Sequence, residues 1–358
     1  MFTLTMLAAG RGDALWLSFG SDDAPRHILV DAGEVCGYEC IQRHVERVRK
    51  RGETVEIDLF VVTHIDADHI NGAFQLVKDL KKLDVKIHEI WFNGYEQIFP
   101  ECVSTLGPGT AERLSARIAA EEIAHNRCFP KNVAAKAADN NFPSAVFSGL
   151  DLTLLAPEAT QLARLKTEWE TKNPGKAFER ERARIEFEKN ETLGASRTAG
   201  DDNSAPNESS IVLLAEFGEV SVLLAGDAYA HDIETSLDRF REVSNKSKPI
   251  SFFKLSHHGS VRNLTASLVT CVGAEHYLIS TNGVQHDHPD QEAVEIILKN
   301  RPTQKNSFHF NYRKPREKIR EAFKGQGIDF GSEPSDNGLE LDLIALSGLH
   351  EPSAPPSE

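Results

Sequence analysis

The chain has 358 residues, 40% of them hydrophobic, which is enough to bury a substantial core and is typical of a folded globular protein. Its formal net charge of −14 argues against a protein that coats nucleic acid through an overall basic surface, although a local basic groove is compatible with it. The sequence has no apolar run of about 18 residues, no secretory signal pattern, and five cysteines without a C-x-x-C pair. We therefore expect a cytoplasmic protein without membrane contact, whose thiols stay reduced.

The first part of the chain alternates between predicted strands and predicted helices. Residues 2–19 contain two apolar runs on either side of a glycine turn, which predicts two strands joined by that turn. Apolar residues recur at helical spacing over residues 41–51, which predicts a helix. The other expected elements are a strand over 27–30, a strand over 59–62, a helix over 72–83 and a strand over 87–92.

Residues 94–207 interrupt this alternation, and we predict a helix-rich insertion there within a single domain over residues 1–350. The insertion could act as a lid, as an arm that binds a protein partner, or as a contact between copies of the chain. Its expected parts are a helix over 110–125, a strand over 152–155, a charged helical stretch over 159–190 and a polar loop over 191–207. The Pro/Ser-rich residues 351–358 are expected to form a disordered tail.

The last part of the chain is again a series of short apolar runs separated by polar turns. Residues 210–217 and 220–225 flank Gly218-Glu219, which predicts a hairpin of two strands. Further strands are expected over 252–255, 276–280, 308–310 and 339–346, and helices over 290–300 and 315–325. Strands and helices interleaved in this way indicate a layered α/β fold.

The sequence T-H-I-D-A-D-H, residues 63–69, directly follows the predicted buried strand over 59–62 and places four metal-type side chains in one loop. Imidazole nitrogens and carboxylate oxygens are groups that bind Zn²⁺ or Mn²⁺. The candidate ligands are His64, Asp66, Asp68 and His69. The alternative is a polar turn in which Asp68 caps the next helix, but this density of histidine and aspartate favours a metal site.

Three later strands also end in potential ligands, which are, in chain order, Asp227, His257, His258, His286 and His288. Strand ends at one edge of an α/β layer converge, so we expect these residues to share a crevice with the loop 63–69. Asp227 follows a glycine that lets the backbone turn, which suits a bridging carboxylate. Two cations about 3.5–4 Å apart could then share a hydroxide as the nucleophile.

Together these motifs resemble those of the metallo-β-lactamase-fold hydrolases, namely T-H-x-D-x-D-H, A-G-D at residues 225–227 and S-H-H-G-S at residues 256–260, each after a strand. Within that superfamily the chain most resembles the hydrolase domain of DNA-uptake competence proteins. The similar segments are G-R-G-D-A (10–14), V-D-A-G (30–33), N-E-S-S-I-V-L-L (207–214), K-L-S-H-H-G-S (254–260) and H-P (288–289). The resemblance implies an αββα sandwich, the metallo-β-lactamase fold, that holds two divalent metal ions.

The resemblance also implies which residues bind each metal ion. The first ion would be held by His64 and Asp66, the second by Asp68, His69 and His257, and both by Asp227. Asp66 stands where the family more often has a histidine, and the added carboxylate favours Mn²⁺ alongside Zn²⁺. The histidine that many members place upstream of the bridging aspartate is absent, and Asn207 in that region could supply a weaker oxygen ligand.

A second set of residues is expected to act on the substrate. We assign His258 to the substrate because only one of two adjacent histidines is expected to face the metals. Ser260 offers a hydroxyl group for a phosphate oxygen. His288, and with weaker support His286, could transfer a proton to the leaving oxygen or bind phosphate, or could be an ordinary loop residue. The expected catalytic residues are Asp68, His258 and His288, and the expected substrate-binding residues are Asn207, Ser260 and His286.

The DNA-uptake subgroup that the chain resembles is linked to DNA degradation, so the resemblance favours hydrolysis of a phosphodiester, in DNA, RNA or a smaller molecule, by a metal-bridging hydroxide. Basic residues support this substrate class, because they bind phosphate without reading sequence. They are Arg313, Lys314, Arg316, Lys318 and Arg320, together with Lys246, Lys248, Lys254 and Arg262. The alternative for 313–320 is a solvated basic helix. Alternative functions are a lactonase or thioesterase of the same fold, and a regulatory module with a degenerate metal site.

Overall fold

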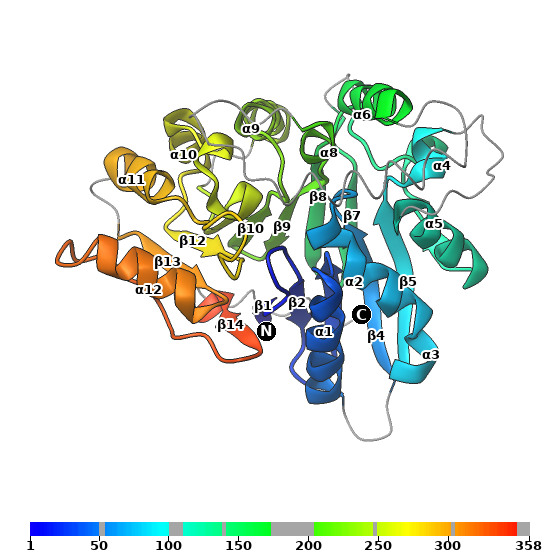
Figure 1. Ribbon diagram of the computed structural model, residues 1–358, viewed down its shortest axis with the longest axis horizontal. Helices are drawn as coiled ribbons and strands as arrows, with labels where there is room; N and C mark the ends of the chain where they lie inside the picture. The colour runs from blue at the N-terminus through cyan, green and yellow to red at the C-terminus, as the bar shows by residue number, and fades with distance from the viewer. Residues whose placement is uncertain are drawn as a thin grey trace.

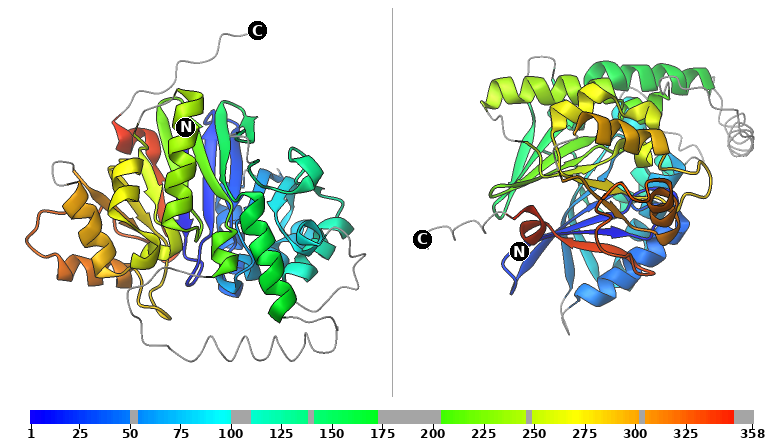
Figure 2. Two further views of the ribbon diagram at one scale, coloured as in Figure 1. Left: turned by 90° about the horizontal axis from the view of Figure 1, so that it is seen from above. Right: turned by 90° about the vertical axis from the view of Figure 1, so that its left-hand side faces the viewer.

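The computed structural model describes residues 1–49, 54–99, 110–137, 141–172, 204–245, 249–301 and 305–348. In these residues two seven-stranded sheets lie face to face, and helices cover the outer face of each sheet (Figure 1). The right-hand view of Figure 2 shows the layers in the order helices, sheet, sheet, helices. The predicted αββα sandwich is therefore confirmed.

The first sheet contains the N-terminal strands and the strand that leads into the loop 63–69. In spatial order its strands are β14 (Gly338–Asp342), β1 (Phe2–Leu7), β2 (Leu15–Gly20), β3 (Pro25–Val30), β4 (Val55–Val62), β5 (Val85–Phe92) and β6 (Ala124–His125). Neighbours from β14 to β3 are antiparallel, and neighbours from β3 to β6 are parallel. Only Glu56 of β4 is exposed, which explains the continuous apolar run before the metal motif.

The second sheet carries the other strand ends that bear potential ligands. In spatial order its strands are β13 (Ser307–Phe310), β12 (His276–Ile279), β11 (Phe252–Lys254), β10 (Val220–Leu224), β9 (Val212–Phe217), β8 (Leu150–Ala156) and β7 (Ser144–Phe147). Neighbours from β13 to β10 are parallel, and neighbours from β10 to β7 are antiparallel. The parallel strands β10, β11 and β12 therefore end at the same edge of the sheet.

Three apolar layers hold the sandwich together. Side chains such as Leu17, Leu154 and Val222 fill the space between the sheets. The first sheet packs its outer face against α1 (Val35–Val48), α2 (Ala67–Lys78), α3 (Leu80–Leu83) and α5 (Thr110–Ala120). The second packs against α9 (Ala230–Ser244), α10 (Ala266–Val272), α11 (Gln291–Asn300) and α12 (Arg313–Ala322). Each fully buried aliphatic or aromatic side chain stabilises the fold by about 1.5–3 kcal/mol relative to exposure, so these layers fix the strand ends that carry the site.

Several predicted elements differ from the structure at their ends. The helix over 41–51 is α1, which ends at Val48, and the helix over 72–83 begins at Ala67 and breaks at Asp79 into α2 and α3. The strand over 339–346 ends at Asp342, because the Asp342 carboxylate accepts a hydrogen bond from the Ala345 backbone N–H at 3.0 Å and caps α13 (Leu343–Ser347). The helix over 110–125 stops at Ala120, and the residues that follow it pair with β5 as β6. The hairpin over 210–225 is confirmed as β9 and β10.

The described part of 94–207 contains strands as well as helices. β6 extends the first sheet, and β7 and β8 extend the second. α6 (Ala159–Lys172) packs against α8 (Ala205–Glu208) and α4 (Tyr95–Ile98) through a small apolar cluster that includes Leu165 and Phe99. The predictions for residues 173–203 and 351–358 lie outside the described residues. Among the described residues, no helix is both long and apolar enough to cross a membrane.

Candidate metal centre

Loops from both sheets meet at one edge of the sandwich and form the candidate site. The first sheet contributes the loops after β1, β3 and β4, and the second contributes those after β10, β11 and β12. Several hydrogen bonds join the loops across the sheets. The Ile211 backbone N–H donates to the Thr63 carbonyl at 2.9 Å, and the Ser280 hydroxyl donates to the Gly12 carbonyl at 3.3 Å. The predicted convergence of strand ends is present.

The loop 63–69 turns its polar side chains toward Asp227. His64 is the second residue after β4, and its Nε2 atom lies 3.9 Å from Asp227 Oδ2. Asp68 and His69 lie in the first turn of α2, and His69 Nε2 lies 3.4 Å from Asp227 Oδ1. Asp66 occupies the N-cap position of α2, yet its carboxylate makes no capping hydrogen bond. The capping alternative thus does not account for these carboxylates.

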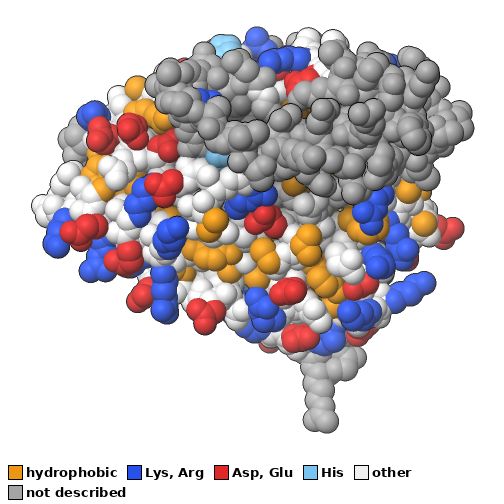
Figure 3. Space-filling model, viewed as in Figure 1, with side chains coloured by type: hydrophobic (Ala, Val, Ile, Leu, Met, Phe, Trp, Pro, Cys, Tyr) orange, Lys and Arg blue, Asp and Glu red, His pale blue; other side chains and the backbone are white. Residues whose placement is uncertain are grey.

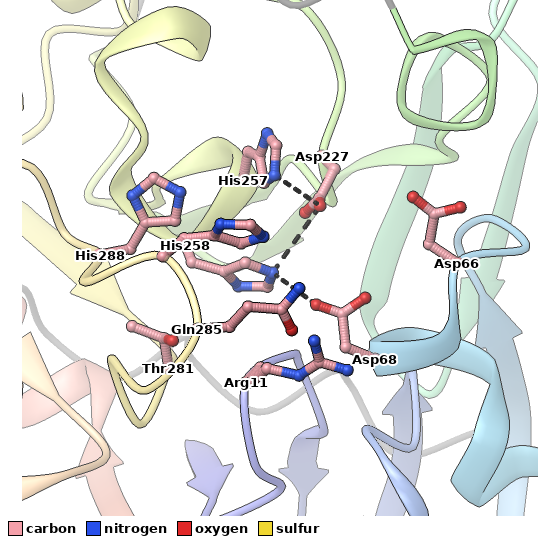
Figure 4. Close-up of a pocket in the computed structure, with 10 residues that line it drawn as sticks. Arg11, Asp66, Asp68, Asp227, His257, His258, Thr281, Gln285 and His288 are labelled. Atoms are coloured by element: carbon pink, nitrogen blue, oxygen red, sulfur yellow. Dashed lines mark ion pairs between the residues drawn. The ribbon is translucent and has the colours of Figure 1, made fainter. Parts of the chain in front are cut away.

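Asp227 is the residue that links the two sides of the site. Gly226 before it has φ +52° and allows the sharp turn after β10. From the opposite loop, Nε2 of His257 and Nε2 of His258 lie 3.8 and 3.7 Å from Asp227 Oδ2. Figure 4 shows both contacts as dashed lines. Asp227 therefore lies where a bridging ligand was predicted.

Both adjacent histidines face the site, although only one was expected to do so. His257 and His258 have φ +46° and +58°, and these two left-handed residues turn both rings inward. His258 Nε2 lies 3.4 Å from Asp68 Oδ2, and its Nδ1 donates to the Ser280 carbonyl at 2.9 Å. His257 Nδ1 instead lies 3.0 Å from Asn263 Oδ1. His258, rather than His257, thus groups with Asp68 and His69.

The ligand atoms form overlapping groups whose members all lie within 4.8 Å of one another. Two of these groups consist of pocket-side ligands, namely His64, His69 and Asp227, and Asp68, His69 and His258. Two further groups include Asp13, which is paired with Lys254. The Nε2 atoms of the three histidines and Oδ1 of Asp227 are buried and have no hydrogen bond with any described residue. Buried polar atoms are normally paired, so this donor set fits divalent cations such as Zn²⁺ or Mn²⁺.

The charges in the group strongly perturb one another. Burial disfavours the Asp227 carboxylate, but the surrounding histidines hold its pKa well below its usual value. Burial likewise opposes protonation of His258, yet the carboxylates of Asp227, Asp13 and Asp68 raise its pKa to about 9. Burial and the neighbouring carboxylates raise the pKa of Asp66 to about 7. Such mutual perturbation is typical of a functional site.

Asp31, at the end of β3, orients two residues of the loop 63–69. Its carboxylate accepts hydrogen bonds from the Thr63 backbone N–H at 2.7 Å, the Thr63 hydroxyl at 2.8 Å and His69 Nδ1 at 2.7 Å. This contact fixes the His69 tautomer and directs Nε2 at the candidate ions. No role was predicted for Asp31 beyond its place in the V-D-A-G segment. The sequence signal for it is its position between the end of a strand and a glycine.

Asp13 and Lys254 form a buried ion pair beneath His258. The Lys254 Nζ atom lies 2.7 Å from Asp13 Oδ2, and the two side chains are 0% and 1% exposed. Burial opposes ionisation of Asp13, but Lys254 and His258 together lower its pKa to about 2. Lys254 also donates to the Leu255 carbonyl at 2.9 Å. The expectation that Lys254 contacts phosphate is therefore wrong, because its ammonium group is buried and paired.

The four remaining predicted residues are divided between the pocket and the structure around it. His286 and His288 line the pocket. Burial lowers the pKa of His288 to about 4, which does not favour the predicted role as a proton donor in the free protein. Asn207 is buried, with Nδ2 3.5 Å from His257 Nδ1. The Ser260 hydroxyl is buried and accepts from the Arg262 backbone N–H, so it caps a short turn and is not among the pocket-lining residues.

The pocket above the ligand groups has an entirely polar lining (Figure 4). Its lining residues are Arg11, Asp66, Asp68, Asp227, His257, His258, Thr281, Gln285, His286 and His288. Arg11, Thr281 and Gln285 were not predicted as site residues, because no short motif relates their loops to the metal ligands. Only the three-dimensional contact of the loops after β1 and β12 places them here.

No protein-family model and no curated protein sequence matches the chain. Solved structures similar to it include the diiron β-hydroxylase CmlA from Streptomyces venezuelae, with a TM-score of 0.41, 12% identity and coverage of 95% of this chain. The chain spans 54% of CmlA. Another is the metallo-β-lactamase-fold protein YhfI from Bacillus subtilis, with a TM-score of 0.40, 10% identity, and coverage of 95% of this chain and 98% of that one.

A metallo-β-lactamase with a HARLDQ motif from Cronobacter sakazakii is also similar, with a TM-score of 0.35, 14% identity, and coverage of 76% of this chain and 90% of that one. The solved structures that resemble the chain thus include metallo-β-lactamase-fold proteins. The resemblance to DNA-uptake competence proteins stays a prediction.

Proposed function

We propose that the chain is a two-metal hydrolase that cleaves phosphodiesters. The observation that carries the proposal is the shared Asp227 carboxylate, which faces buried imidazole nitrogens from both sheets that have no hydrogen bond with any described residue. When bound, divalent cations supply Lewis-acid stabilisation of charge on a phosphoryl oxygen and lower the pKa of water. Either Zn²⁺ or Mn²⁺ suits the mixture of imidazole and carboxylate ligands.

The side chains around the ions hold the ligands in place and receive the substrate. Asp31 fixes His69, and the Ser280 carbonyl fixes His258, so that each ring directs Nε2 into the site. His288 lies on the pocket wall, and burial lowers its pKa to about 4, so its ring is neutral at neutral pH in the free protein. A phosphate anion bound beside His288 would favour its protonated form, which is the form that assists a leaving oxygen.

The polar lining favours a phosphodiester over the lactone or thioester alternative. Pockets that accept acyl chains are lined mainly by apolar side chains. None of the described residues that line this pocket is apolar. A charged phosphodiester with polar substituents matches this surface better than a hydrocarbon chain does.

The basic residues near the site give less support to nucleic acid than expected. Lys318 is engaged by Asp287 and the Pro289 carbonyl, and Arg316 pairs with Glu317 at 2.8 Å. Arg320 also pairs with Glu317, and Arg313 with Glu333, both at 3.3–3.4 Å. Figure 3 shows basic and acidic side chains interspersed over the described part of that face. Lys246 and Lys248 lie outside the described residues. DNA and RNA are therefore test substrates rather than the preferred ones.

The proposal is tested with protein loaded with Mn²⁺ or Zn²⁺ and given bis-p-nitrophenyl phosphate, a dinucleotide, single- and double-stranded DNA, RNA and a lactone panel. We expect metal-dependent cleavage of phosphodiesters and none of lactones. Asp68→Ala should lower kcat/KM by about 10²-fold or more, whereas Asp151→Ala, which removes an exposed carboxylate on β8, should leave it unchanged. Cleavage of lactones alone, or phosphodiester cleavage indifferent to Asp68→Ala, contradicts the proposal.

A further inference from the structure

We propose that Arg11 is the anion-binding residue of the pocket and holds two oxygens of a substrate phosphate group through the two ends of its guanidinium. The inference rests on the proposed phosphodiesterase function and adds a substrate requirement to it. Arg11 is the only lysine or arginine among the described residues that line the pocket. It lies on the loop after β1, and Figure 4 shows its guanidinium pointing toward Asp68.

Glu34 binds the backbone N–H and the Nε atom of Arg11 but forms no hydrogen bond with its Nη atoms. Arg11 Nε donates to Glu34 Oε1 at 2.7 Å, and the Arg11 backbone N–H donates to Glu34 Oε2 at 3.1 Å. Both carboxylate oxygens are thus used by one residue. The Nη1 and Nη2 atoms make no hydrogen bond with any residue that the structure describes, and the guanidinium forms its ion pair with Glu34 through Nε. Glu34 therefore orients the guanidinium without occupying its fork.

The glycines on either side of Arg11 make this arrangement possible. Gly10 has φ +92°, and a Cβ atom there would lie 2.3 Å from Glu34 Oε2. A Cβ atom at Gly12 would lie 1.8 Å from the Asp68 backbone oxygen. Only residues without a side chain let the loop approach both Glu34 and the start of α2 this closely. The loop thus places Arg11 next to a candidate metal ligand.

The free fork of Arg11 matches the geometry of a phosphate group. Two parallel N–H donors bind two oxygens of one phosphate, which a lysine ammonium cannot reproduce. The pocket is otherwise lined by three carboxylates and by imidazoles, so an anionic substrate needs a fixed cation beside the metal ions. The phosphate could be the scissile diester itself or a terminal phosphate one linkage away.

An alternative is that Arg11 only neutralises Glu34 and so stabilises the loop. The two roles differ in what they change. A neutralising role affects the stability of the fold and leaves the affinity for phosphate unaltered. An anion-binding role changes KM and phosphate affinity while the ions and kcat are retained.

The test uses the full chain loaded with Mn²⁺ and compares Arg11→Gln and Arg11→Lys with wild type. The control is Arg47→Gln, which removes an Arg–Glu contact of the same 2.7 Å length outside this pocket. Binding of inorganic phosphate is measured by titration calorimetry, metal content by mass spectrometry, and kinetics with the dinucleotides TpT and pTpT.

We expect Arg11→Gln to weaken phosphate binding and raise KM by about tenfold or more, Arg11→Lys to restore only part of the loss, and Arg47→Gln to have no effect. Metal content should stay at the wild-type value in all variants. A raised KM for both dinucleotides assigns Arg11 to the scissile phosphate, and a raised KM for pTpT alone assigns it to a terminal phosphate.

Unchanged phosphate affinity and unchanged KM in Arg11→Gln would overturn the inference and leave the proposed function standing. If the protein cleaves no phosphodiester but loses phosphate binding in Arg11→Gln, the proposed function fails and Arg11 remains an anion-binding residue. The two proposals can therefore fail separately.

Discussion

The carboxylate oxygens of Asp227 lie 3.4–3.9 Å from nitrogen atoms of His64, His69, His257 and His258. The sequence predicted that these residues would meet, because each follows a strand and is of a metal-binding type. It did not predict that both His257 and His258 face Asp227, since this depends on two consecutive left-handed backbone conformations. A single sequence does not show that two consecutive histidines after a strand adopt left-handed backbone conformations.

The buried pair of Asp13 and Lys254 leads to a prediction about stability. Lys254→Met leaves the Asp13 carboxylate buried without its partner, so we expect the free energy of unfolding to fall by about 3–5 kcal/mol. The double variant Asp13→Leu/Lys254→Met removes both charges and should be more stable than the single variant. Urea unfolding of the metal-free protein measures both changes.

A matched control is Lys299→Met, which removes an exposed ion pair with Glu295 of 3.0 Å and should cost at most about 1 kcal/mol. An equal effect of Lys254→Met and Lys299→Met on the free energy of unfolding would contradict this prediction.

The contribution of Asp13 to folding stability depends on pH because its pKa is lowered in the folded protein. Because that pKa is about 2 in the folded protein and about 3.9 unfolded, the stabilisation is complete above about pH 4 and is lost as the pH falls toward 2.

Most strands and helices were predictable, because their apolar periodicity reflects which face is buried. The strands β1 to β5 and β9 to β13 all lie where apolar runs were found. The helix α9 was missed because charged and polar residues separate its apolar positions. The helix α10 was missed because its seven residues are too few to show a clear helical period. The end of β14 was misplaced because a single capping carboxylate, Asp342, decides where the strand stops.

The close approach of the loop after β1 to α2 gives a prediction about this pair of elements. In Gly12→Ala the new Cβ atom would meet the Asp68 backbone oxygen at 1.8 Å, so the start of α2 or the loop must move. We expect the displaced Asp68 to weaken binding of one metal ion by about 10–100-fold, which equilibrium titration with a competing chelator would measure.

Gly325→Ala is the control for this substitution. Gly325 has φ +84° and no atom within 4 Å of the position that a Cβ would take. Alanine there strains the backbone but causes no steric clash. It should lower stability and leave metal affinity at the wild-type value. Wild-type metal affinity in Gly12→Ala would show that the loop does not position Asp68.

At the scale of the whole molecule, two sheets bring together six strand ends that are distant in sequence. The sequence indicated layers and a common edge, but it could not show that the loops after β1 and β12 complete the pocket wall with Arg11, Thr281 and Gln285. Arg11 lies far from Thr281 and Gln285 in the sequence, so no short sequence motif contains them together. They also determine the proposed choice of substrate, since they make the wall polar and add its one fixed cation.

If two divalent ions were held with Asp227 as a common ligand, the number of bound ions per chain would show it. The protein is loaded with Mn²⁺ or Zn²⁺, passed through gel filtration and analysed by inductively coupled plasma mass spectrometry. We predict about two ions per chain for wild type, about one for His258→Ala, and fewer than one for Asp227→Ala. No retained metal in wild type, or two ions in Asp227→Ala, would contradict the account.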